Sequence, residues 1–271
     1  MSGQISNIRI NKIMNGTNRR LKRLFDKESG NTMILALDHG ANEGMIDGLG
    51  SIQSILESLP ESGVQGVILN KGLARHYGHL IPEDVNLIIQ LNAGTRHGSP
   101  SYNKNIVCSI SEALRLGADA VSMHVNIGND LEDRMLVDLG EITDEAHQLG
   151  IPVLATVLAR GSQIVNEHDS SLVAHCIRIG AELGPDIVAV SYPSNGDTFT
   201  KAVAASPVPV LVTGGPLGQN LEGALNNTAK GLKAGCRGFC IGRNIFQTEK
   251  PIESMKKYAK IAHKRSTISE N

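Results

Sequence analysis

Eight short apolar runs, separated by longer segments with helical periodicity, constrain the fold of this 271-residue chain more than any other feature. The runs are rich in aliphatic and β-branched residues, which is typical of buried parallel strands. Each longer segment can form the crossover helix that a parallel strand requires. The runs occupy residues 33–37, 66–69, 87–91, 120–124, 153–157, 187–190, 208–212 and 238–241. The helical segments occupy residues 51–59, 110–116, 131–149, 171–183, 199–205 and 221–234.

Four glycines mark the junctions between these segments. Gly117, Gly150, Gly184 and Gly235 each follow a helical segment and precede an apolar run by a few residues. Glycine is favoured where a helix ends, because the backbone there turns into the left-handed region. The pattern therefore predicts alternating α/β structure.

Eight strands favour a closed (β/α)8 barrel over an open, doubly wound sheet. The glycine-rich GxGxxG turn that often follows the first strand of an open sheet is absent, since the chain reads ALDHGANEG there. A barrel needs about 250 residues, so we expect one domain over residues 1–271. Within it, residues 1–30 form an N-terminal extension whose NRRLKRLF segment is a helix, covering the closed end of the barrel or contacting another subunit. Residues 263–271 form a frayed tail.

The composition indicates a small-molecule partner. The 26 basic and 27 acidic side chains give a net charge of −1, so no overall field attracts nucleic acid or a membrane surface. The four cysteines form no paired CxxC motif, and no histidine cluster accompanies them, so they are interpreted as reduced packing residues rather than metal ligands. The polar N-terminus resembles neither a signal peptide nor a membrane span, and a cytoplasmic location is expected.

Candidate functional residues are sought just after the strands, because (β/α)8 barrels carry their sites at the C-terminal ends of the strands. Asp38 and His39 follow the first run, and Asp38 is a candidate general base, a hydroxyl ligand or only a cap on the next turn. His124 and Asn126 end the fourth run and either bind substrate hydroxyls or serve the structure. Arg160 and Tyr192, which follow the fifth and sixth runs, are further candidates for substrate binding.

Lys71 is the one lysine placed directly after a predicted strand. A partly desolvated lysine can lose its proton and form a Schiff base with a ketone. The other interpretation is that Lys71 pairs with Asp38 or with a phosphate.

Two glycine-rich turns follow the last two runs, with the sequences VTGGP and IGRNIF. Backbone N–H groups in such turns form anion nests, and the seventh and eighth strands are where barrels commonly bind phosphate. Gly214, Gly215, Gly242 and Arg243 are therefore candidates for phosphate binding, although the glycines would also suit tight turns alone.

Together these stretches resemble the DeoC/FbaB family of lysine-dependent (class I) aldolases, in the branch of 2-amino-3,7-dideoxy-D-threo-hept-6-ulosonate synthase, LsrF and archaeal fructose-bisphosphate aldolase. The matches include LALDHG, GADAVSMHVNIG, VLVTGGP and IGRNIFQ, in the family's order. The resemblance implies that Asp38 is the family's aspartate and that Gly214, Gly215, Gly242 and Arg243 bind phosphate.

The resemblance also implies two substitutions at the centre of the family's chemistry. The family's Schiff-base lysine lies in a pattern like DIVKTxY, which reads DIVAVSY here, so Ala189 occupies its position. The family's tyrosine lies in a pattern like MYPRG, which reads VLARG here and places Leu158 there. A methyl group cannot replace an amine as an electron sink.

Three functional hypotheses follow. In the first, which we favour, the protein is an aldolase-type enzyme on a phosphorylated ketose or keto acid, with Lys71 as the amine or with enolisation by Asp38 and His39, and it uses no cofactor. In the second, it is a catalytically silent sugar-phosphate-binding homologue that regulates or scaffolds a partner. In the third, a divalent metal held by Asp38, His39 and His124 is the electrophile, but no dedicated ligand cluster indicates one. The resemblance further implies a homo-oligomeric ring of five or ten subunits.

Overall fold

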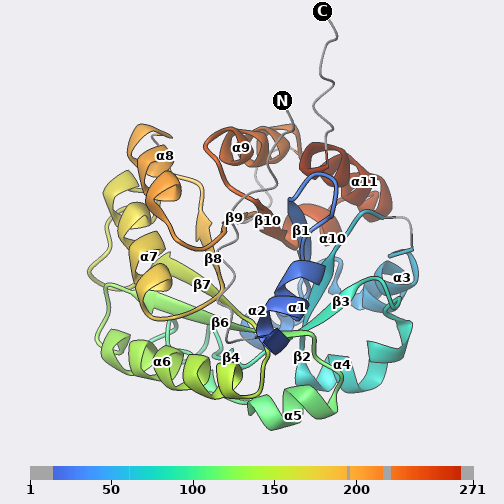
Figure 1. Cartoon of the computed structure of the whole chain (residues 1–271), viewed down its shortest axis with the longest axis horizontal. Coiled ribbons are helices and arrows are strands. Elements are labelled where there is room, and N and C mark those ends of the chain that lie inside the picture. The colour runs from blue at the N-terminus through green and yellow to red at the C-terminus, as the bar shows by residue number, and fades with distance from the viewer. Residues whose placement is uncertain (1–14, 61, 194–195, 216–220, 264–271) are drawn as a thin grey trace, which may run out of the picture.

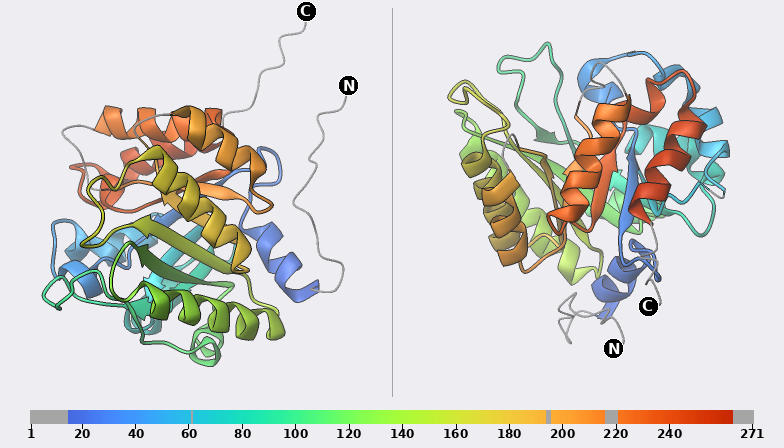
Figure 2. Two further views of the ribbon diagram at one scale, coloured as in Figure 1. Left: turned by 90° about the vertical axis from the view of Figure 1, so that its left-hand side faces the viewer. Right: turned by 90° about the horizontal axis from the view of Figure 1, so that it is seen from above.

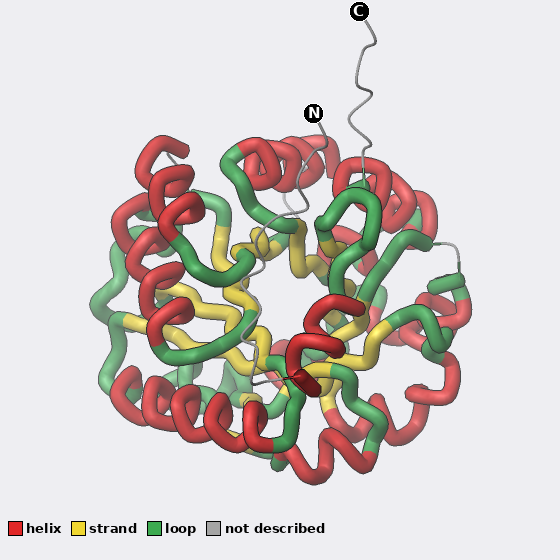
Figure 3. The backbone as a smooth tube through the Cα atoms, viewed as in Figure 1, coloured by secondary structure: helices red, strands yellow, loops and turns green. Residues whose placement is uncertain are grey.

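The computed structural model describes residues 15–60, 62–193, 196–215 and 221–263, and within them eight parallel strands close into a barrel (Figures 1 and 3). The strand order is β1-β10-β9-β8-β7-β6-β3-β2, with β2 returning to β1. This confirms the predicted (β/α)8 fold. The strands are β1 (Thr32–Ala36), β2 (Gly66–Asn70), β3 (Asn86–Gln90), β6 (Ala120–Ile127), β7 (Val153–Ala159), β8 (Ile187–Ser191), β9 (Val210–Thr213) and β10 (Gly238–Ile241).

Helices surround the barrel, as the tube in Figure 3 shows. Helices α1, α3 and α5 to α9 correspond to the predicted segments, whereas α2, α4, α10 and α11 lie outside them. A two-stranded antiparallel sheet of β4 (Asn92–Ala93) and β5 (Asn105–Ile106) lies between β3 and β6 in the chain. The helices are α1 (Asn15–Arg23), α2 (Gly40–Glu43), α3 (Ile52–Glu57), α4 (Lys71–Tyr77), α5 (Ile110–Arg115), α6 (Glu132–Gln148), α7 (Ser170–Glu182), α8 (Gly196–Ala205), α9 (Leu221–Lys233), α10 (Arg243–Phe246) and α11 (Pro251–Ala262), with single 3-10 turns at Leu49–Ser51 and Gly78–Leu80.

The strands are buried on both faces, which explains why they read as continuous apolar runs. Alternate residues of β1 separate into two apolar clusters, with Met33 and Leu35 packing toward the helices and Ile34 and Ala36 belonging to the cluster inside the barrel. The same alternation of side-chain direction, with a period of two residues, occurs in the other strands of the barrel. The inner cluster is filled by one or two side chains from each strand, among them Ile68, Ile88, Ala120, Leu154, Ile187, Ala189, Leu211 and Cys240.

Helix α1 covers the end of the barrel opposite the functional loops. Its Leu21, together with Leu24 and Phe25, joins the inner apolar cluster, so the helix closes the barrel floor. Arg20 donates from Nη1 to the carbonyl of Gly150 at 2.8 Å and Arg23 pairs with Asp119 at 2.7 Å. Figure 2 shows α1 at one end of the barrel, with the loops around residues 95–103 and 162–168 at the other. The predicted N-terminal helix thus covers the closed end of the barrel, whereas residues 1–14 of the predicted extension and all but His263 of the predicted tail over residues 263–271 lie outside the described residues.

The predicted glycine caps and buried cysteines are also confirmed. Gly117, Gly150, Gly184 and Gly235 have φ of 87°, 70°, 101° and 100°, each in the left-handed region that ends a helix. All four cysteines are buried and unpaired, and burial raises the pKa of each thiol. No described helix is long and apolar enough to cross a membrane.

Candidate functional site

A polar pocket opens at the C-terminal ends of the barrel strands. Every barrel strand or the turn that follows it contributes to the lining, together with Lys104 next to β5. The structure brings nine of the eleven predicted residues into this pocket. They are Asp38, His39, His124, Asn126, Arg160, Gly214, Gly215, Gly242 and Arg243.

Asp38 lies between two histidines. Its carboxylate oxygens are 3.8 Å from His39 Nδ1 and 3.8 Å from His124 Nε2, and its side chain is only 9% exposed. The Asn70 amide donates to the Asp38 carbonyl at 2.7 Å, which fixes the backbone at the end of β1. At 3.8 Å neither imidazole makes a direct hydrogen bond to the carboxylate. The Asp38 carboxylate therefore remains available to a ligand that enters between the rings.

Burial keeps both histidines in the neutral form at physiological pH. It lowers the pKa of His39, although the negative charge of Asp38 opposes this effect. Burial lowers the pKa of His124 to about 4, again against the influence of Asp38, and the positive charge of Lys104 lowers it further. A neutral imidazole can both donate and accept a proton. Each neutral ring can accordingly donate one hydrogen bond and accept another in the pocket.

A chain of amide and hydroxyl groups holds His124 in place. Ser122 Oγ donates to Gln90 Oε1 at 2.5 Å, and Gln90 Nε2 donates to Asn92 Oδ1 at 2.7 Å. Asn92 in turn donates to the His124 carbonyl at 2.8 Å and accepts from the His124 amide at 2.9 Å. Because these polar groups are buried and satisfied, they stabilise one geometry of the pocket wall.

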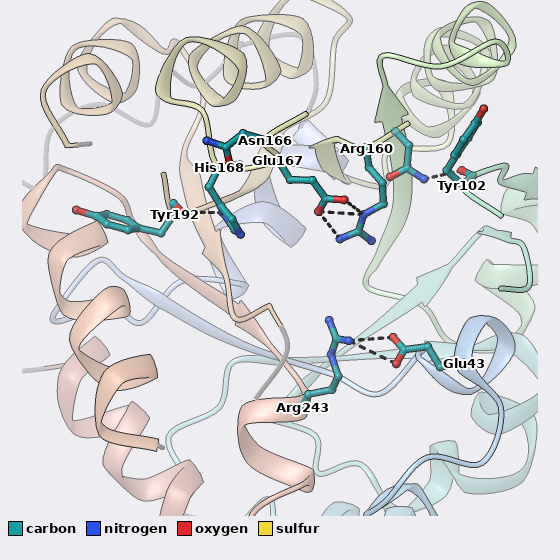
Figure 4. Close-up of polar contacts among 9 residues, drawn as sticks. Glu43, Tyr102, Arg160, Asn166, Glu167, His168, Tyr192 and Arg243 are labelled. Carbon is teal, nitrogen blue, oxygen red and sulfur yellow. Dashed lines mark hydrogen bonds and ion pairs between the residues drawn. The ribbon is translucent and has the colours of Figure 1, made fainter. Parts of the chain in front are cut away.

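Two arginines face the centre of the pocket from opposite sides, as Figure 4 shows. Arg160 pairs with Glu167 at 3.0 Å, and Arg243 pairs with Glu43 at 3.2 Å. The Arg243 side chain is 20% exposed and its Nε atom is buried without a partner. Arg243 therefore has donor capacity left for an anionic ligand.

The two glycine turns bring backbone close to this arginine. A Cβ atom on Gly242 would lie 2.2 Å from the Ala36 carbonyl oxygen and 2.6 Å from His39 Cε1, so only glycine allows β10 to end this close to β1. Gly215 has φ of 64°, in the left-handed region. The Gly214 amide already donates to the Cys240 carbonyl at 3.2 Å and belongs to the barrel ladder.

Lys104 is a charged pocket residue that the sequence analysis did not single out. It lies at the end of the loop between β4 and β5, and its Nζ donates to Asn42 Oδ1 at 2.8 Å. The residue is 8% exposed, and burial lowers the pKa of its amine although Asp38 opposes the effect. The available signal was a polar, glycine- and proline-containing loop after the third strand, AGTRHGSPSYNKN, which the strand-end rule does not reach.

The structure does not bring Lys71 and Tyr192 into the pocket. Lys71 is the first residue of α4, and its exposed amine donates to the Val107 carbonyl at 2.5 Å. The Tyr192 ring packs edge-on against Phe199 at 5.5 Å, and Figure 4 shows it pointing away from the two arginines. Neither side chain supports the role predicted for it, because neither reaches the other candidates.

The two positions that the family resemblance singled out lie at different depths. Ala189 is fully buried in the apolar cluster inside the barrel, in register with Thr156 and Leu211. Leu158 lines the pocket itself. An alanine in the apolar layer and a leucine in the wall supply no proton-transfer group, so any chemistry must come from the other polar side chains.

No set of three histidine, cysteine or acidic side chains is arranged to hold a metal ion in the part of the chain that the structure describes. The trio Asp38, His39 and His124, suggested as metal ligands by the sequence, does lie together. Asp38 is 3.8 Å from each ring, and a common ion would need all three groups to turn toward one point.

Fold and site together define an aldolase-type (β/α)8 barrel with its polar groups at the C-terminal rim. The model of the DeoC/LacD family aldolases matches residues 32–248, and the chain belongs to this family.

Curated relatives and solved structures agree with this assignment. A Streptomyces griseus 2-amino-4,5-dihydroxy-6-oxo-7-(phosphonooxy)heptanoate synthase is 33% identical over 248 residues, which cover 92% of this chain and 90% of the relative. An Archaeoglobus fulgidus 2-amino-3,7-dideoxy-D-threo-hept-6-ulosonate synthase is 36% identical over 250 residues, covering 92% of each protein. The crystal structure of an archaeal fructose 1,6-bisphosphate aldolase superimposes with a TM-score of 0.82 at 32% identity, covering 92% of this chain and all of that one.

The low pKa of His124 has a consequence for stability. The folded-state pKa is about 4, below the ordinary value of 6.5, so between these pH values the unfolded chain binds more protons. The contribution of neutral His124 to the free energy of unfolding is fully present above pH 6.5 and is lost as the pH falls toward 4. We expect the wild type to lose up to about 2 kcal/mol more unfolding free energy between pH 7 and pH 5 than His124→Gln does. Urea unfolding at both pH values measures the difference, and equal losses would show that His124 is not the responsible group.

Proposed function

We propose that this chain is an aldolase that forms or cleaves a carbon–carbon bond in a phosphorylated ketose or keto acid, without a cofactor. The observation that carries the proposal is the placement of the buried Asp38 carboxylate in the same pocket as Arg243 and the Gly215 and Gly242 turns. A carboxylate beside a phosphate-binding corner can remove a proton from the carbon next to a ketone. The names of the relatives, a phosphonooxy-heptanoate synthase and a fructose 1,6-bisphosphate aldolase, support a phosphorylated substrate.

We assign the phosphate to the corner formed by Gly215, Gly242 and Arg243. Arg243 would exchange its contacts with Glu43 for the phosphate, because a guanidinium binds a dianionic phosphate more strongly than a single, partly solvated carboxylate. His124 and Asn126, on β6, lie on the adjoining wall and would contact substrate hydroxyls. Arg160 lies on the opposite side of the pocket and would bind a second anionic group of the substrate.

The experiment that tests the proposal is an assay of the purified protein with fructose 1,6-bisphosphate in the cleavage direction, and with dihydroxyacetone phosphate and a panel of aldehydes in the direction of bond formation. Product is followed by mass spectrometry and substrate binding by calorimetry. Turnover with any phosphorylated donor supports the proposal. Absence of both turnover and binding across the panel would overturn it.

A catalytically silent binding protein is the second candidate function. It is favoured by Leu158, an aliphatic side chain in the pocket wall where the resemblance implies a tyrosine. This candidate predicts calorimetric binding of phosphoketoses with no product, a combination that the same experiment detects.

Arg243 gives a prediction that is specific for the phosphate. We expect Arg243→Gln to raise the KM for dihydroxyacetone phosphate, or its dissociation constant, by roughly 10- to 100-fold, since a hydrogen bond to a charged group contributes about 1.5–3 kcal/mol. Weak binding of unphosphorylated dihydroxyacetone should change little, because the lost contact is to the phosphate. Parallel titrations of both ketones with both proteins check this, and equal weakening of the two would place the phosphate elsewhere.

A further inference from the structure

The strongest feature that the proposed function leaves unused is the buried amine of Lys104. The two pocket arginines are each paired with a carboxylate, Arg160 with Glu167 and Arg243 with Glu43. Lys104 has its hydrogen bond to the neutral amide of Asn42 instead. An ammonium has three protons to donate, and a largely desolvated ammonium bonded to one neutral acceptor is poorly stabilised. Burial therefore lowers the pKa of the Lys104 amine and raises the fraction present as the neutral nucleophile.

The backbone of Lys104 is fixed rather than carried on a loose loop. The residue directly precedes β5, whose Asn105 and Ile106 pair with Ala93 and Asn92 of β4. The lysine stem lies over Gly94, where an added Cβ would be 3.7 Å from Lys104 Cδ and 2.0 Å from the Asn103 carbonyl oxygen. Gly94 thus lets the strand and the lysine stem approach closely. A positioned amine of this kind is what covalent catalysis requires.

The amine also has the right neighbours. Asn42 and Glu43 are consecutive residues at the end of α2, and the first holds Lys104 while the second holds Arg243. Lys104 and Arg243 both line the same pocket, so α2 holds the amine and the phosphate-binding guanidinium in one site. Asp38 is close enough for its charge to act on Lys104, His39 and His124 together.

We propose that Lys104 is the amine that forms the Schiff base with the ketone carbon of the phosphorylated donor, in the role that Ala189 cannot perform. The proposal rests on the proposed aldolase function and names the electrophile that it needs. It replaces the assignment of this role to Lys71, whose exposed amine lies outside the pocket.

The covalent sequence balances without an added oxidant, reductant or metal. The neutral Lys104 amine attacks the ketone carbon, and an N–H proton moves to the former carbonyl oxygen to give a carbinolamine. A second proton, relayed through Asp38 and His124, lets this hydroxyl leave as water, and a protonated imine remains. The Asp38 carboxylate then takes a proton from the adjacent carbon, and the electron pair moves to nitrogen as the enamine forms.

The second half of the reaction regenerates the amine. The enamine carbon attacks the carbon of an aldehyde acceptor, and the aldehyde oxygen takes the proton held by Asp38. Water then adds to the new protonated imine and releases the product ketone. This step regenerates the Lys104 amine and releases the proton that was taken up when the carbinolamine lost water. The bond that forms is the carbon–carbon bond, and cleavage runs through the same steps in reverse.

The test is borohydride reduction in the presence of dihydroxyacetone phosphate, followed by peptide mapping of the adduct. We expect a single adduct on Lys104. Lys104→Met should lose the adduct and reduce kcat by at least about a thousandfold, in the range seen when a covalent catalytic group is removed, while binding of the phosphoketose stays within a few-fold. Lys256→Met, at an exposed position on α11, is the matched control and should keep both the adduct and the activity.

A substrate-free measurement keeps the result independent of turnover. Reductive methylation of the purified protein with formaldehyde and cyanoborohydride, followed from pH 7 to pH 11, gives the pKa of each lysine from its rate of modification. Lys104 should react with a pKa below the ordinary lysine value of 10.5. Thermal unfolding of Lys104→Met reports whether the variant is folded, and a midpoint at or above the wild type is expected because the buried amine has been replaced by an apolar side chain of similar length.

The outcomes separate the Schiff-base proposal from the proposed function. Turnover without an adduct on Lys104, or with Lys104→Met still active, would overturn the role of Lys104 and leave the aldolase function standing. An adduct on Lys71 would restore the sequence-based assignment. Binding without turnover or adduct would overturn both proposals in favour of the silent binding protein, and absence of binding would overturn the proposed function and with it this inference.

Discussion

Replacing Asp38 with asparagine is expected to lower kcat of the carbon–carbon bond step by roughly 10²- to 10⁴-fold, the range typical of a general acid–base group. Asparagine keeps the shape of the side chain and its place between His39 and His124, but it cannot accept a proton from carbon. The loss should therefore appear in kcat, while the affinity for dihydroxyacetone phosphate changes only a few-fold.

The same variant divides the reaction into its two chemical stages. Imine formation uses the Lys104 amine and precedes proton removal from carbon, so Asp38→Asn should still give a borohydride adduct on Lys104, although more slowly. Deuterium exchange at the carbon beside the ketone, followed by mass spectrometry in heavy water, measures the proton-removal step directly and should fall in parallel with kcat. An adduct without exchange is the expected pattern.

The control for this experiment is Asp144→Asn, which makes the same chemical change on the exposed face of α6. It should retain wild-type kcat and exchange rates. If Asp38→Asn also stays within threefold of the wild type, Asp38 is a hydroxyl ligand or a structural cap, and one of the two neutral histidines must remove the proton instead.

The barrel could be predicted from the sequence because its information is local and repeated. Each predicted strand is an apolar run of four or five residues, which is the length of six of the eight barrel strands, while β6 and β7 are longer. Each of four helices ends at a glycine that the structure places in the left-handed region. The proposed phosphate-binding corner follows from the same logic, because Gly214 and Gly215 come after β9 and Gly242 comes directly after β10. A search of the strand ends succeeds for such residues because the strands themselves determine where they lie.

The same rule failed where the chain turns before a side chain can face the pocket. Lys71 follows β2 directly, but α4 begins at this residue and carries its amine to the outside. Tyr192 follows Ser191, and because strand residues alternate in direction, the serine lines the pocket and the tyrosine packs on the helix side. The alternation of β8 would have been enough to exclude Tyr192.

Lys104 could not be predicted from the strand-end rule, because its position depends on a tertiary contact. It enters the pocket from a small antiparallel sheet of β4 and β5, and it is held by Asn42 from a different part of the chain. Nothing local in SYNKN shows that this lysine is buried. The stretch from residue 94 to residue 104 is nevertheless a long excursion at the functional end of a barrel, and loops of that kind commonly carry function.

The seam between β1 and β10 gives the prediction with the largest expected effect on stability. Gly238 has φ of 136°, a conformation that side chains rarely adopt, and it pairs in register with Thr32. A Cβ at this position would lie 1.9 Å from the Thr32 carbonyl oxygen and 2.8 Å from its carbonyl carbon and amide nitrogen. Because these are backbone atoms of the neighbouring strand, neither strand can yield without breaking the ladder that closes the barrel.

Gly238→Ala should therefore lower the free energy of unfolding by about 3–5 kcal/mol, the exceptional range reserved for strain and overpacking in a core. The matched control is Gly140→Ala in the middle of α6, where no atom lies within 4 Å of the added methyl group. That change should leave stability unchanged or raise it by about 0.5–1 kcal/mol, because alanine loses less backbone entropy than glycine in a helix. Urea unfolding of the three proteins compares them. Equal midpoints for Gly238→Ala and Gly140→Ala would mean that the seam can open, and that closure of the barrel does not depend on this contact.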